Sequence, residues 1–74
     1  MDYIQVFLVD MPAKIEGLTV RNSDGSYTIL INAGLSSIAQ CRAYDHEMDH
    51  INNRDWDHIF DAGEAEQVRH RWSA

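Results

Sequence analysis

Residues 44–51 of the chain, Tyr-Asp-His-Glu-Met-Asp-His-Ile, contain the motif HExxH in the form HEMDH. On a helix, residues four apart lie on one face, one turn above each other. His46 and His50 would therefore aim imidazole nitrogens at one metal ion. Glu47, about 100° further round the helix, would reach a water held by that metal. The pattern predicts a zinc site in which Glu47 takes a proton from the water.

The residues that flank the motif favour a metal site over a solvated surface helix rich in Asp, Glu and His. At about 100° per residue, four side chains group opposite the two histidines: Cys41, Tyr44, Met48 and Ile51. The helix is therefore predicted to have an apolar back and a polar front. A chance match of HEMDH on a surface helix is the weaker interpretation.

The composition indicates one small domain over residues 1–74. A core of this size is marginal, so a bound metal would add stability. The formal net charge of −6 argues against binding to nucleic acid or anionic membranes, and it fits a cation site or a basic partner.

No apolar run approaches membrane-spanning length and no signal peptide is evident, so the cytoplasm is the expected location. Cys41, the single cysteine, is expected to be buried.

Local patterns predict three strands followed by two helices. The strands are expected at residues 3–9, 18–21 and 27–31, with a hairpin turn over 22–26. These strands predict a small three-stranded, largely antiparallel sheet. The fold class is therefore α+β, with the two helices packed on one face and the motif helix beside the strand 27–32.

Both helices carry terminal signals. The first is predicted from about Ser37, with Gln40 completing a capping box, to Ile51, where Asn52-Asn53 ends it. The second is predicted from the N-cap Asp61 to about residue 72. Its apolar stripe would consist of Ala62, Ala65, Val68 and Trp72.

A third metal ligand is expected after His50, because a catalytic zinc usually has three protein ligands. Glu66 on the second helix is preferred, since it flanks the apolar stripe and has no local role. Glu64 comes next, although it occupies the N3 position of the predicted capping box. The remaining candidate ligands are Asp55, Asp57 and His58.

The chain resembles the compact ImmA/IrrE-type metallopeptidases of bacteria and their mobile elements, within the broader zincin class. The resemblance rests on FLVDMP at 7–12, TILINAGLS at 28–36, YDHEMDHI at 44–51 and EAEQVRH at 64–70. It implies Zn²⁺ bound by His46, His50 and Glu66, with Glu47 as the base. The family helix tends to carry Asn, Asp or His four residues after the ligand glutamate, where this chain has His70.

Together these features predict hydrolysis of a peptide bond in a peptide or protein substrate, with Glu47 as general base. Asp45, Asp49 or a backbone carbonyl could orient the histidines. Two different functions also fit the residues. The chain could be a non-catalytic, acidic metal-binding protein with a basic partner, or a domain that needs a partner to complete its substrate cleft.

Overall fold

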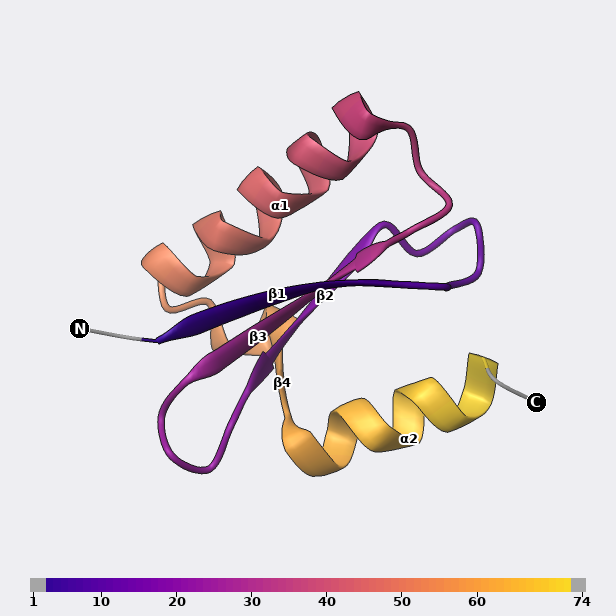
Figure 1. Ribbon diagram of the computed structural model, residues 1–74. Coiled ribbons are helices and arrows are strands. Elements are labelled where there is room, and N and C mark those ends of the chain that lie inside the picture. Colours follow the sequence, from indigo (N-terminus) through magenta and orange to yellow (C-terminus); the bar gives the residue numbers. More distant parts are fainter. Residues whose placement is uncertain (1–2, 73–74) are drawn as a thin grey trace.

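The computed structural model describes residues 3–72, with a four-stranded sheet between two helices (Figure 1). The elements in chain order are β1 (Ile4–Val9), β2 (Gly17–Arg21), β3 (Tyr27–Asn32), α1 (Ser37–Asn52), the 3-10 turn η1 (Trp56–His58), β4 (Ile59–Asp61) and α2 (Ala62–Trp72). The α+β class is confirmed. Among the described residues, neither helix combines the length and the apolar character that a membrane crossing requires.

The sheet is mixed and has the strand order β1-β3-β2-β4. β2 and β3 form the predicted antiparallel hairpin, whose turn contains Gly25 at a φ of 88°. β1 lies parallel to β3, and β4 lies parallel to β2. The prediction of a three-stranded, largely antiparallel sheet was therefore wrong. β4 has only three residues, too few for an alternating pattern to be recognised.

The two helices cover opposite faces of the sheet, so the prediction that both pack on one face was wrong as well (Figure 1). Side chains alternate between the two faces of a strand. In β3, Ile29 and Ile31 pack with Ala43 of α1, whereas Leu30 packs with Ala65 of α2. The apolar run of β3 thus belongs to a central strand that is buried on both faces, as is typical of a sheet between two layers of helix.

Both helices begin at residues whose side chains cap the first turn, and the cap of α1 lies one residue before the predicted position. The N-cap of α1 is Ser36 rather than Ser37, and its side chain accepts a hydrogen bond from the Ala39 N–H at 3.2 Å. At the start of α2, Asp61 and Glu64 form the predicted reciprocal capping box. The Glu64 N–H donates to Asp61 Oδ1 at 2.8 Å, and the Asp61 N–H donates to Glu64 Oε1 at 3.4 Å.

The apolar stripe predicted for α2 is present in part. Ala65 is buried and Val68 is half-buried, whereas Ala62 is exposed. The side chain of Trp72 lies outside the described part of the chain. Ala65 is therefore the residue through which α2 is seen to enter the core.

Asn32, at the end of β3, ties the long β1–β2 connection to the sheet. Its side-chain amide donates to the carbonyls of Met11, Pro12 and Ile15 at 3.3, 3.2 and 2.9 Å. Its side-chain oxygen, Oδ1, accepts a hydrogen bond from the Gly34 N–H at 2.9 Å. The residue is only 3% exposed, so these bonds satisfy a buried amide.

Candidate metal centre

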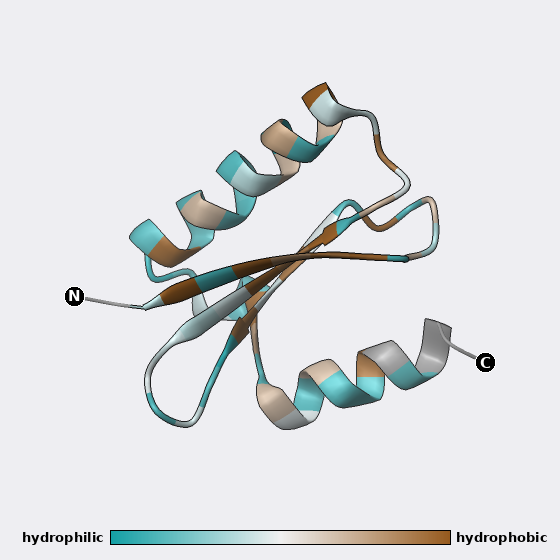
Figure 2. Cartoon of the chain, viewed as in Figure 1, coloured by the Kyte–Doolittle hydropathy of each residue, from teal (hydrophilic) through white to brown (hydrophobic). Residues whose placement is uncertain are grey.

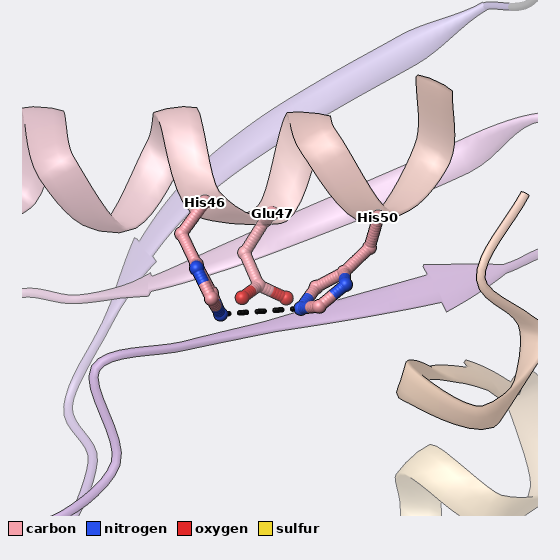
Figure 3. A group of neighbouring side chains, drawn as sticks. All are labelled: His46, Glu47 and His50. Carbon is pink, nitrogen blue, oxygen red and sulfur yellow. Dashed lines mark hydrogen bonds between the residues drawn. The ribbon is translucent and has the colours of Figure 1, made fainter. Parts of the chain in front are cut away.

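The motif residues point from α1 toward the sheet, above β2 (Figure 3). The buried residues of α1 are Ala43, Glu47 and Ile51, so Glu47 lies in the middle of the face that packs on the core. The buried face of α1 is therefore not the predicted apolar face, although the two share Ile51. Tyr44 and Cys41 are exposed, and the expectation that Cys41 is buried was wrong.

The two motif histidines converge on one point. Their Nε2 atoms lie 3.2 Å apart, and their rings meet at 81° with centroids 4.6 Å apart. Two ring nitrogens at this distance either share one proton or face a common cation. In a tetrahedral zinc site with Zn–N distances of about 2.0–2.1 Å, two nitrogen ligands lie about 3.3–3.4 Å apart. The two donors therefore fit a single zinc ion with little adjustment.

Glu47 lies beside the histidine pair and is held by β2. Its Oε1 accepts a hydrogen bond from the Thr19 hydroxyl at 2.8 Å, and the two residues are 7% and 0% exposed. Ligand-type atoms of His46, Glu47 and His50 all lie within 4.8 Å of one another. A buried carboxylate is costly without a compensating charge, and a cation bound by the histidines would supply that charge.

Gly17 leaves room for the Glu47 side chain. A Cβ atom at position 17 would lie 3.3 Å from Glu47 Cγ and 3.2 Å from the Leu30 carbonyl oxygen. The sequence does not predict Gly17 or Thr19 as part of the site. Both lie far from the motif in sequence, and neither residue type signals a partner in another element.

Asp55 supports His50 from the segment after α1. Its Oδ2 lies 3.3 Å from His50 Nδ1 and 2.9 Å from His58 Nδ1, and the rings of His50 and His58 stack with centroids 4.7 Å apart. The hydrogen bond from His58, with a smaller contribution from His50, lowers the pKa of the Asp55 carboxyl. If Asp55 accepts the Nδ1 proton of His50, the Nε2 lone pair of that ring is left for a metal.

His50, Asp55 and His58 also form a second group of ligand-type atoms within 4.8 Å of one another. His50 belongs to both groups, with Nε2 toward His46 and Nδ1 toward Asp55. The sequence predicts Asp55 and His58 only as less favoured ligands. In this arrangement, the Asp55 oxygen contacts ring nitrogens and has the geometry of an orienting group.

The structure does not bring Glu66 to the histidines. It is exposed on α2, and its neighbour Ala65 packs on the face of the sheet opposite α1. Glu64 caps α2, and Asp57 is exposed in η1. His70 also lies on α2. Neither group of ligand-type atoms found among the described residues includes a residue of that helix.

The contact with a motif histidine that was expected of Asp45 or Asp49 is made instead by Asp55. Asp45 lines a groove between α1 and β1, and Asp49 is exposed. Asp55 pairs with His50 and follows the helix rather than belonging to it.

Searches of family models, of curated proteins and of solved structures find no match to the chain. The resemblance to ImmA/IrrE-type metallopeptidases therefore rests on the motifs and stays a prediction.

Proposed function

We propose that the chain is a zincin-like domain that binds Zn²⁺ through His46 and His50 and hydrolyses a peptide bond. The observation that carries this proposal is the 3.2 Å separation of the two Nε2 atoms, with the Glu47 carboxylate beside them. Imidazole nitrogens with this spacing suit zinc, a borderline-soft ion. A solvated helix would not require two rings to converge above a buried carboxylate.

Zinc, when bound, supplies Lewis-acid chemistry, because it polarises a carbonyl group and lowers the pKa of a coordinated water. Glu47 acts as the general base. It accepts a proton from the attacking water and passes it to the leaving amine. The Thr19 hydroxyl occupies Oε1 at 2.8 Å, so Oε2 is the oxygen available for the proton. Asp55 fixes the tautomer and direction of the His50 ring.

The ligand set differs from the one that the family resemblance implies. With Glu66 on the far side of the sheet, the described residues offer His46 and His50 as the two nitrogen donors, and the next acidic groups are Glu47 and Asp55. The remaining coordination positions are left to solvent, to substrate or to a partner protein. This arrangement favours a domain whose cleft is completed by a partner, since His46 is exposed on the surface of the described chain.

Metal content and peptide cleavage, measured on the same preparations, test the proposal. The wild-type chain should bind about one zinc ion, and His46→Ala and His50→Ala should each weaken binding sharply. Glu47→Gln should keep the zinc and lose cleavage of a peptide library. Asp49→Asn is the matched control, because it removes an exposed acid from the same helix. Full zinc occupancy in a double histidine variant would refute the metal site.

A second candidate function is a non-catalytic metal-binding interaction protein. Its support is the burial of Glu47, since a carboxylate that is 7% exposed and bonded to Thr19 also suits a structural role. Zinc-loaded wild type that cleaves nothing across the library, and that melts at a higher temperature than the apo protein, would favour this function over hydrolysis.

A further inference from the structure

β1 is an edge strand that is apolar on both faces. Among the described residues it pairs only with β3, and its segment Ile4–Val9 contains no charge and no proline. Val6, Phe7 and Leu8 are 45%, 48% and 60% exposed. Figure 2 shows that the strand is hydrophobic along most of its length. Natural monomers usually protect such an edge with charged residues, prolines or bulges, and this strand has no charge or proline to protect it.

The outer backbone of β1 has a defined set of open hydrogen-bonding groups. The carbonyls of Tyr3 and Val9 accept hydrogen bonds from the N–H groups of Tyr27 and Ala33 at 2.8 and 2.9 Å. Because the backbone groups of successive strand residues point to alternate sides, the odd-numbered residues of β1 face β3. The N–H and C=O groups of the even-numbered residues, Ile4, Val6 and Leu8, therefore point outward.

An apolar groove of about 550 Å³ runs beside this edge. Its apolar lining comes from Val6, Leu8 and Ile31 of the sheet and from Cys41 and Tyr44 of α1, and its polar rim consists of Ser37, Gln40 and Asp45. α1 packs mainly on β2 and β3. On the α1-facing side of β1, Ile4 is half-buried against the core, whereas Val6 and Leu8 stay exposed. An occupant of this edge must therefore supply both a strand backbone and apolar side chains.

We propose that β1 pairs antiparallel with β1 of a second copy of the chain and joins the two sheets into one. In the register centred on Phe7, Phe7 lies opposite its own counterpart, and Val6 lies opposite Leu8. The outward-facing Val6 and Leu8 then form hydrogen-bonded pairs. Phe7 forms the closer, non-hydrogen-bonded pair, in which aromatic side chains meet.

A second copy fits this edge because β1 is complementary to itself. The register sets Val6 against Leu8 on the α1 face and Phe7 against Phe7 on the other, while Gln5 lies opposite Val9 and Ile4 opposite Asp10 toward the strand ends. The exposed apolar side chains on or beside the edge are Tyr3, Val6, Phe7, Leu8 and Tyr44. At roughly 200 Å² per large side chain, complete coverage of their exposed fractions would bury about 500 Å² per copy. The pair would then bury at most about 1,000 Å² through these side chains, which is the lower limit for a specific interface. The dimer is accordingly concentration-dependent.

The interface is independent of the proposed hydrolytic site. His46 and His50 point toward β2, and β3 lies between β2 and β1 in the sheet. Each copy carries a formal charge of −6, so added salt screens repulsion between copies and strengthens the dimer. Binding of a basic partner strand to the same edge would instead weaken with salt.

Analytical ultracentrifugation over a wide concentration range, at low and high salt, tests the proposal. Wild type should dimerise, and Leu8→Lys should be monomeric where wild type is half dimeric. Gln67→Lys, which adds the same charge on exposed α2, should behave as wild type. The zinc content of Leu8→Lys should equal that of wild type. A protein that does not dimerise would therefore not count against the metal site.

Hydrogen exchange gives a residue-level readout of the same pairing. The N–H groups of Val6 and Leu8 should become protected as concentration rises, while that of Phe7, which faces β3, should change little. Wild type that stays monomeric at every concentration overturns the proposal. A dimer that persists in Leu8→Lys, or one in which Val6 and Leu8 gain no protection, overturns it equally.

Discussion

Removal of the Asp55 carboxylate should weaken zinc binding without removing a ligand. Asp55 Oδ2 lies 3.3 Å from His50 Nδ1, on the side of the ring opposite the Nε2 atom that faces His46. Loss of a group that orients a metal-ligating histidine typically costs about 10- to 100-fold in affinity, or about 1.4–2.8 kcal/mol. We expect Asp55→Ala to fall in this range and Asp55→Asn to fall near its lower end, since an amide oxygen can still accept the Nδ1 proton.

Competition with a chromophoric chelator measures these affinities directly. Asp57→Asn is the control, because Asp57 is exposed in η1 two residues away. The melting temperature of each apo protein separates a local effect from general destabilisation. If Asp55→Ala binds zinc as tightly as wild type, the orienting role is refuted. A loss as large as that of His46→Ala would instead make Asp55 a direct ligand.

Individual contacts and the metal site give four more expected outcomes. Glu47→Gln should keep zinc bound and lower cleavage by about a hundredfold or more, as measured by turnover of a peptide that wild type cleaves. Asn32→Ala should lower the free energy of unfolding by about 2–4 kcal/mol in urea titrations, because four hydrogen bonds of a buried amide are lost. The hydroxyl and N–H of Ser26 lower the pKa of the Asp24 carboxyl below its ordinary value of 3.8. The difference in free energy of unfolding between wild type and Asp24→Ala should therefore be largest above pH 3.8 and should shrink as the pH falls below that value, as measured by urea titrations. Chelation should lower the melting temperature of zinc-loaded protein, and coincident melts would contradict this.

Local signals predicted the elements that have enough residues to show a pattern. The hairpin turn, the two helices and the Asp61 cap depend on neighbouring residues, and all are present. β4 was missed because it contains three residues within a polar segment. The placement of α2 could not be predicted, because a strand such as β3, apolar at successive positions, can accept a helix on either face.

The site residues also divide into those that local spacing predicts and those that depend on how distant elements pack. His46, Glu47 and His50 come together because four-residue spacing on one helix is sufficient to place them. The preference for Glu66 required both helices to lie on one face of the sheet, and that assumption failed with the sheet topology. Thr19 could not have been found, since its contact with Glu47 crosses 28 positions of sequence.

The positions of the supporting residues indicate why metal binding and folding should be coupled. His46, Glu47 and His50 come from α1, but Thr19 comes from β2 and Asp55 from the segment before η1. The same segment leads directly into β4, which pairs with β2. An ion that holds His50 in place would therefore also hold its contact with Asp55. Through Asp55, it would hold the segment that leads into β4. Because ligand binding to the folded state alone adds to its stability, zinc would stabilise the α1 face of the sheet, whereas α2 would contribute to the core without touching the metal.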